Sequence, residues 1–249
     1  MSTRYLIVFQ PRSGSTYLTS ALHNPEKGCV SGFEIFSRSD SAAMEYLTVG
    51  EFRDFGPAVK RELLSRFFAA HKDKAAAGCK VAPYQINDDV PGFFLHAQEL
   101  CQRIIFLYRA NPIEAAVSQL WALERARQGQ LARLVRGEEN TFTKLTVKRD
   151  EFRWYVTSSI VEAELIMLLA ELCRVEKLLF SYEEFFLDVE RSLATVQQFL
   201  GLDALAQSEL IKIRPKNIMD SVNNYADLVK WSEELGLSCD LSTASASQS

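Results

Sequence analysis

Short apolar runs alternate with segments of helical periodicity along most of the chain. This alternation is typical of a parallel sheet that is flanked by helices. The predicted strands are Tyr5–Phe9, Cys29–Ser31, Cys79–Ala82, Arg103–Tyr108 and Lys177–Ser181. The predicted helices are Thr16–His23, Ala58–His71, Pro91–Cys101, Pro112–Leu134, Asp150–Cys173 and Val189–Leu200. We therefore expect an α/β fold.

Capping residues mark the ends of two of these helices. Asn111 precedes Pro112, and Glu114 follows three residues after the cap, which is a variant of the capping box. Gly201 directly follows an apolar helical segment and is typical of a helix end. The segment 136–150 has little periodicity and is expected to be a long loop. Residues 1–236 are expected to form one domain, and the small polar tail 237–249 to be disordered.

One junction between a predicted strand and helix, Gln10–Leu18, has the layout of a phosphate-binding loop. An apolar strand ends, Pro11 turns the chain, and the sequence RSGST leads into the helix. Successive backbone N–H groups in such a turn form a concave anion site, which the positive end of the helix reinforces. Arg12 adds a permanently charged donor, and Ser13, Ser15 and Thr16 add hydroxyls.

This loop lacks the lysine of a nucleoside triphosphatase. The Walker pattern requires two glycines that bracket four residues, followed by Lys and then Ser or Thr. Here only Gly14 is present and no lysine follows it. No acidic residue suited to holding magnesium ends a predicted strand, because RIIFLYR ends in Arg109. The loop is therefore expected to hold an anion other than a magnesium-bound triphosphate.

Composition narrows the class of protein only modestly. The formal net charge is −4, which argues against a broad nucleic-acid surface but not against a local basic pocket. No apolar segment is long enough for a signal peptide or a membrane span, so a soluble, cytoplasmic protein is expected. The five cysteines are scattered, which favours reduced structural thiols over disulfides or a zinc site.

The sequence QPRSGSTYL resembles the 5′-phosphosulfate loop of sulfotransferases that use 3′-phosphoadenosine 5′-phosphosulfate (PAPS). That loop usually reads P-[RK]-[ST]-G-[ST]-T-[WYLF]-L. A second segment, RIIFLYRANPIEAAVSQ, resembles the family's strand that ends in arginine before a helix carrying a serine. The resemblance implies a three-layer, P-loop NTPase-like parallel sheet flanked by helices. It also implies that Arg12, Ser13, Gly14, Ser15 and Thr16 bind the 5′-phosphosulfate, and that Arg109 and Ser118 bind the 3′-phosphate.

The reaction also requires a base for the acceptor hydroxyl, and Glu34 is the preferred candidate. It follows the second predicted strand between apolar neighbours, where partial burial would raise its pKa toward a useful value. Its position resembles that of the base proposed for trehalose and carbohydrate sulfotransferases. Arg12 is too basic to give up a proton readily, so it is expected to stabilise the leaving oxygen electrostatically. No metal is required by this scheme.

Several other residues are open to two readings. The three histidines are expected to be capping, surface or packed residues and not bases. Lys80 either points into the crevice or faces solvent, and Arg214 and Lys216 resemble late family contacts only loosely. Trp121 and Trp154 are more simply read as core residues than as stacking platforms.

The function that we expect from the sequence is PAPS-dependent sulfuryl transfer to a hydroxyl group. The acceptor stays open among a sugar, a lipid, a small alcohol and a polyketide-like or peptide metabolite. Two other functions are also open: a nucleotide-dependent kinase with a degenerate loop, and a non-catalytic nucleotide-binding protein of the same fold. A homodimer is left open.

Overall fold

The computed structural model describes residues 2–32, 34–36, 46, 51, 55–129, 134–135, 144–203, 210–211 and 218–238. The contacts of the chain divide it into two compact units. Unit 1 comprises Met1–Ala110 and Val161–Leu210, and unit 2 comprises Asn111–Ile160 and Ile211–Ser249. The expectation of one domain over residues 1–236 stays a prediction.

A parallel five-stranded sheet forms the centre of unit 1. Its order is β2-β3-β1-β4-β6, and every adjacent pair is parallel. The strands are β1 (Thr3–Phe9), β2 (Cys29–Gly32), β3 (Ala76–Val81), β4 (Arg103–Tyr108) and β6 (Glu176–Ser181). The five predicted strands are thus confirmed, with small shifts at their ends.

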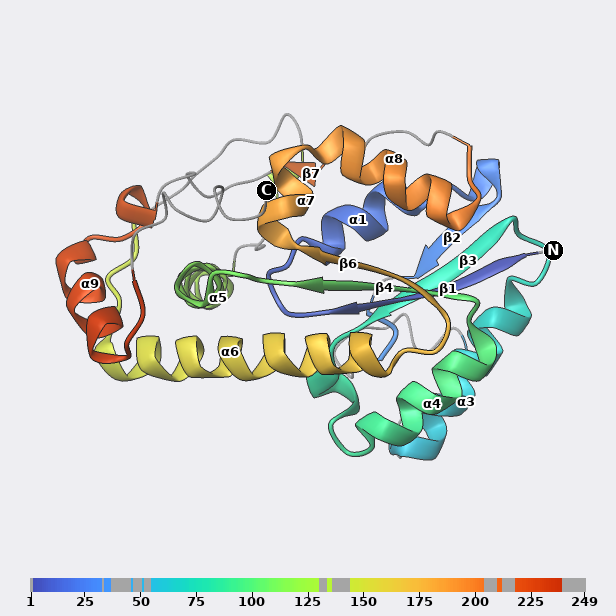
Figure 1. Cartoon of the computed structure of the whole chain (residues 1–249), viewed down its shortest axis with the longest axis horizontal. Helices are drawn as coiled ribbons and strands as arrows, with labels where there is room; N and C mark the ends of the chain where they lie inside the picture. The colour runs from blue at the N-terminus through green and yellow to red at the C-terminus, as the bar shows by residue number, and fades with distance from the viewer. Residues whose placement is uncertain are drawn as a thin grey trace. The chain divides into compact units, whose positions relative to one another are not determined.

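Helices cover both faces of this sheet (Figure 1). One face packs against α3 (Pro57–Ala70), α4 (Val90–Leu100) and the second half of α6 (Arg149–Leu172). The other face packs against α1 (Ser15–Leu22), α7 (Tyr182–Leu187) and α8 (Val189–Leu200). The central strand β1 is apolar and buried on both sides, as expected for a parallel sheet between two helical layers. The predicted three-layer α/β fold is therefore confirmed.

Among the described residues of unit 1, two short 3₁₀ helices connect elements of the fold. The first, η1 (Pro25–Lys27), leads into β2, and the second, η3 (Pro83–Ile86), follows β3. Gly201 adopts a left-handed φ of 68° at the end of α8, which confirms the predicted helix end.

Unit 2 has its own apolar core between α5 (Pro112–Arg127), the first half of α6, η4 (Ile218–Asp220) and α9 (Tyr225–Glu234). The short strands β5 (Leu134–Val135) and β7 (Leu210–Ile211) complete the elements of the chain that the structure describes. Asn111 caps α5, because its side-chain oxygen accepts a hydrogen bond from the Glu114 N–H at 3.0 Å. The predicted helix Pro112–Leu134 is too long, since Gln128 and Gly129 form a turn in which Gly129 has a φ of 70°.

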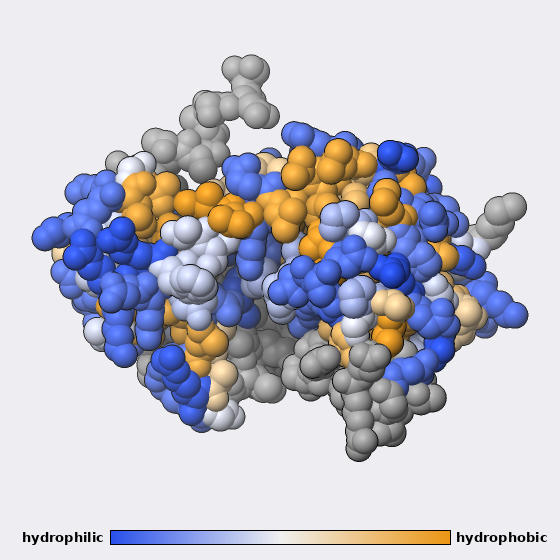
Figure 2. All heavy atoms as spheres, turned by 90° about the horizontal axis from the view of Figure 1, so that it is seen from below, coloured by the Kyte–Doolittle hydropathy of each residue, from blue (hydrophilic) through white to orange (hydrophobic). Residues whose placement is uncertain are grey.

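Exposed apolar side chains follow the second half of α6. Val161, Leu168 and Leu172 are all exposed and recur at helical spacing. Figure 2 shows hydrophobic surface on the side of the molecule where α6 lies. Within the described part of the chain, no helix is both long enough and apolar enough to cross a membrane.

Close packing between β1 and β3 gives the first testable prediction. Gly78 lies opposite Tyr5, and a Cβ added at Gly78 would lie 2.3 Å from the fully buried Tyr5 ring. Gly78→Ala should therefore lower the free energy of unfolding by about 1–3 kcal/mol, measured by urea denaturation. Gly56→Ala is the matched control, because a Cβ there meets no atom within 4 Å. Equal stability of the two variants would contradict the packing described.

Candidate active site

The loop that follows β1 is anchored to the carboxyl end of the neighbouring strand β4. The Gln10 N–H donates to the Leu107 carbonyl at 2.8 Å. The Gln10 side-chain oxygen accepts from the Arg109 N–H, also at 2.8 Å, and this bond is buried. The loop therefore lies at the carboxyl edge of the sheet, where α/β proteins bind their ligands.

Two left-handed residues shape the loop. Arg12 has a φ of 66° and Gly14 a φ of 80°. The Ser13 N–H between them donates to the Gln10 carbonyl at 3.1 Å and closes the turn. Tight turns that lead into a helix in this way form anion-binding concavities. Only glycine fits at position 14, since a Cβ there would lie 2.4 Å from the Phe186 ring of α7.

The start of α1 offers unpaired hydrogen-bond donors to an anion. Gly14 occupies the N-cap position, so no side chain caps the helix. The first N–H groups of a helix have no partners within it, and its positive end favours negative charge. The Ser13 hydroxyl is buried and makes no hydrogen bond in the structure. A phosphate or sulfate group would fit here, because it would accept hydrogen bonds from the N–H groups at the start of α1 and from the Ser13 hydroxyl.

Lys80 connects this loop to Glu34. Its side chain is 1% exposed and extends from β3, so it points into the site and not into solvent. The ammonium group donates to the Thr16 hydroxyl at 2.8 Å and lies 3.1 Å from a carboxylate oxygen of Glu34. It also lies 4.9 Å from the centroid of the Phe9 ring, which adds a cation–π contact.

The second oxygen of Glu34 is held by Gln85. The Gln85 amide nitrogen donates to it at 3.3 Å, while the Gln85 amide oxygen accepts from the Ala82 N–H at 2.8 Å. Glu34 is thus oriented from both sides, although about a third of its side chain stays exposed. An oriented and accessible carboxylate next to an anion-binding loop has the geometry of a general base.

Tyr84 and Glu162 belong to the surroundings of Glu34. Burial, and then the negative charges of Glu34 and Glu162, raise the pKa of Tyr84 to about 12. As a whole residue Tyr84 is 51% exposed. The hydroxyl is therefore protonated at neutral pH and can donate a hydrogen bond near Glu34.

Arg109 is buried at the end of β4, with its side chain 1% exposed. Its Nε atom lies 3.0 Å from a carboxylate oxygen of Glu183, and its guanidinium carbon lies 3.9 Å from the centroid of the Tyr182 ring. The Nη1 atom donates to the Arg12 carbonyl at 3.4 Å.

Ser118 is buried on α5, in unit 2, whereas Arg109 belongs to unit 1. Their joint binding of a 3′-phosphate stays a prediction.

The histidines have structural partners. His23 at the end of α1 shares a hydrogen bond with the Ser31 backbone, and His71 at the end of α3 with the Tyr46 hydroxyl. His96 on α4 lies 3.0 Å from the Ser65 hydroxyl of α3.

Of the remaining sequence candidates, Arg214 and Lys216 lie outside the described residues. Trp121 is buried, while Trp154 is 69% exposed and is therefore not the core residue that was expected.

Three residues of this site were not singled out from the sequence. They are Tyr182 and Glu183 at the start of α7, and Gln85 in η3. The signal that could have identified them is their position, since each follows directly on the carboxyl end of β6 or β3. Side chains at these positions converge at the edge of the sheet that also holds the loop.

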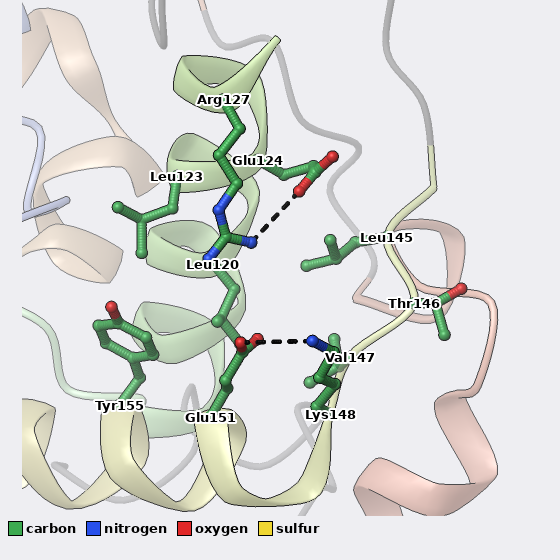
Figure 3. Close-up of a pocket in the computed structure, with 10 residues that line it drawn as sticks. All are labelled: Leu120, Leu123, Glu124, Arg127, Leu145, Thr146, Val147, Lys148, Glu151 and Tyr155. Carbon is green, nitrogen blue, oxygen red and sulfur yellow. Dashed lines mark hydrogen bonds and ion pairs between the residues drawn. The ribbon is translucent and has the colours of Figure 1, made fainter.

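A separate cavity of about 200 Å³ lies within unit 2. Figure 3 shows α5, the first turns of α6 and residues 145–148 around it. Leucines and valine form part of its wall, and two ion pairs lie at its edge: Arg127 with Glu124 at 3.4 Å, and Lys148 with Glu151 at 3.9 Å. Because these charges pair with one another, the cavity presents no net charge to a ligand.

No protein-family model and no curated protein matches the chain. Among solved structures, a sulfotransferase from Alicyclobacillus acidocaldarius is similar with a TM-score of 0.49 and 16% identity, over 94% of this chain and 95% of that chain. A sulfotransferase domain from the curacin biosynthetic pathway has a TM-score of 0.48 and 15% identity, over 82% of this chain and 75% of that chain. Shikimate kinase from Bacteroides thetaiotaomicron has a TM-score of 0.42 and 16% identity, over 80% of this chain and 99% of that chain.

Glu162 gives a prediction for the pH dependence of stability. Burial raises its pKa from 4.5 to about 6, so its charged form is disfavoured in the folded protein. A folded-state pKa above the unfolded value means that stability decreases as pH rises from 4.5 to 6. Glu162→Gln should therefore stabilise the protein at pH 8 by about 1 kcal/mol, after allowance for its partial exposure, and should have no effect at pH 4.

Urea denaturation at both pH values measures this difference. Glu164→Gln is the control, because it changes an exposed glutamate of the same helix. A stabilisation by Glu162→Gln that is the same at both pH values would contradict the effect of burial.

Proposed function

We propose that the protein is a sulfotransferase that moves a sulfuryl group from PAPS to a hydroxyl group of a small-molecule, sugar or lipid acceptor. One observation carries the proposal: Lys80 binds the Thr16 hydroxyl of the anion-binding loop and the Glu34 carboxylate at the same time. A base and an anion site are thereby held on opposite sides of one ammonium group. Transfer of a charged group to a hydroxyl requires both of them.

The loop would hold the 5′-phosphosulfate of the donor. Ser13, Ser15 and Thr16 would supply hydroxyls, and Ser15 and Thr16 would also supply backbone N–H groups at the start of α1. Gly14 allows the close approach of the backbone. Arg12 would supply positive charge to the oxygen that bridges phosphorus and sulfur. On the sequence resemblance alone, Ser118 would contribute to the binding of the 3′-phosphate.

In the reaction, the acceptor oxygen attacks sulfur while the bond between sulfur and the bridging phosphate oxygen breaks. The acceptor proton passes to Glu34, and 3′-phosphoadenosine 5′-phosphate (PAP) leaves with the negative charge. Arg12, the loop N–H groups and Lys80 would stabilise this charge as it develops. Arginine, lysine and amide groups then supply the charge that a kinase obtains from magnesium.

A kinase and a non-catalytic nucleotide-binding protein are the two rival functions. The kinase is favoured by the structural similarity to shikimate kinase, but the loop lacks the lysine of the Walker pattern. A binding protein would need the loop but has no use for a carboxylate that is oriented from both sides.

Thermal unfolding with nucleotides distinguishes the sulfotransferase from the kinase. PAP at 100 times its dissociation constant should stabilise the folded protein by about 2.7 kcal/mol without added metal. Stabilisation by ATP with magnesium, and none by PAP, would reject the proposed function in favour of the kinase.

The role of Glu34 is tested by Glu34→Gln. This variant should keep its affinity for PAP and lose about 10²–10⁴-fold in kcat, because it keeps the shape of the side chain but cannot accept the proton. PAP release from PAPS in the presence of sugar, lipid and small-alcohol acceptors measures turnover. Glu26→Gln, at an exposed position in η1, should behave like the wild type. Full activity of Glu34→Gln would show that another group is the base.

A further inference from the structure

The surroundings of Arg109 are those of a structural cation. The guanidinium group is enclosed by Glu183, the Tyr182 ring and the Arg12 carbonyl, and its side chain is only 1% exposed. A charged group in such a position is stable only when its neighbours neutralise it and accept its hydrogen bonds. One of those neighbours is the backbone of the anion-binding loop itself.

Glu183 holds the end of β4 through both of its oxygens. One oxygen forms an ion pair with the Arg109 Nε atom at 3.0 Å without making a hydrogen bond to it. The other oxygen accepts a hydrogen bond from the Ala110 N–H at 2.9 Å. The parallel register explains this proximity, because Tyr108 at the end of β4 lies opposite Ser181 at the end of β6. The residues that follow each strand therefore meet at the carboxyl edge of the sheet.

The same short helix, α7, also contacts the loop directly. A Cβ at Gly14 would lie 2.4 Å from the Phe186 ring and 3.4 Å from the Tyr182 ring. Both left-handed residues of the loop are thus supported from α7: Gly14 by ring packing, and Arg12 through Arg109. A left-handed non-glycine residue persists only where its surroundings hold it in place.

We propose that Arg109, fixed by Glu183 and Tyr182, is a positioning residue that braces the anion-binding loop. By donating to the Arg12 carbonyl, it fixes the Arg12–Ser13 peptide, whose N–H donates to the Gln10 carbonyl. The turn held in this way directs the N–H groups at the start of α1 toward the 5′ end of the donor. This inference rests on the proposed function for the identity of the ligand. It differs from the role that the sequence resemblance implies, in which Arg109 binds the 3′-phosphate.

Two nucleotides that differ only in the 3′-phosphate separate the two roles. PAP carries this phosphate and adenosine 5′-phosphate does not, so titration calorimetry with both isolates its contribution. For a brace, Glu183→Gln and Arg109→Ala should weaken the binding of both nucleotides by the same factor, about tenfold or more for one charged hydrogen bond. Millimolar guanidinium should partly restore binding to Arg109→Ala.

Two outcomes would overturn the brace. In the first, Arg109→Ala weakens the binding of PAP but not of adenosine 5′-phosphate, or Glu183→Gln strengthens the binding of PAP. Either result is expected if Arg109 binds the 3′-phosphate and Glu183 competes with that phosphate for Arg109. In the second, the variants lower the unfolding temperature but leave both affinities unchanged, which would make the contact purely structural. Glu184→Gln is the matched control, because Glu184 is the next residue to Glu183 in α7. The Glu184 carboxylate accepts hydrogen bonds from the N–H and the hydroxyl of Ser181, and the oxygen of glutamine can still accept them.

Amide hydrogen exchange tests the brace independently of the ligand. Residues 12–16 should exchange faster in Glu183→Gln than in the wild type and in Glu184→Gln, because the loop loses its support. Unchanged exchange there would overturn the brace. If the wild-type protein binds neither nucleotide but exchange rises as expected, the proposed function fails and the brace stands.

Discussion

A buried ammonium group must be neutralised where it lies, and this constraint at Lys80 organises the site. Lys80 reaches the carboxyl end of β3 inside the fold, where water cannot stabilise its charge. The Glu34 carboxylate supplies the opposite charge, and the Thr16 hydroxyl and the Phe9 ring supply further contacts. Since Glu34 and Thr16 come from different connections of the sheet, one cation fixes the distance between two loops.

A second buried cation, Arg109, lies on the other side of the same loop. It differs from Lys80 in its partners, because its carboxylate and its aromatic ring both come from the start of α7 and it also donates to the backbone of Arg12. The loop thus lies between a lysine that holds its last residue, Thr16, and an arginine that holds Arg12. Such preorganisation lowers the reorganisation needed when charge develops on a bound group.

The sheet, most of its helices and the anion-binding loop could be predicted from the sequence, because apolar periodicity and glycine position are local signals. Arg109 was predicted as a ligand contact from its place at a strand end, but its burial against Glu183 could not be predicted. That pairing depends on the register between β4 and β6, which are separated by a long stretch of sequence. The ion pair between Lys80 and Glu34 was missed for the same reason, since the order of parallel strands is not encoded in any one segment.

The strand order has a consequence for synthesis. The central strand β1 precedes both of its neighbours in the chain, since Thr3 pairs with Ala76 and Tyr5 with Arg103. During translation the apolar residues of β1 therefore leave the ribosome well before either partner strand exists. Until β3 and β4 follow, β1 is an unpaired hydrophobic strand of the kind that holdase chaperones shield and that promotes aggregation. The central strand is thus the one for which the longest stretch of chain must be synthesised before both of its neighbours are present.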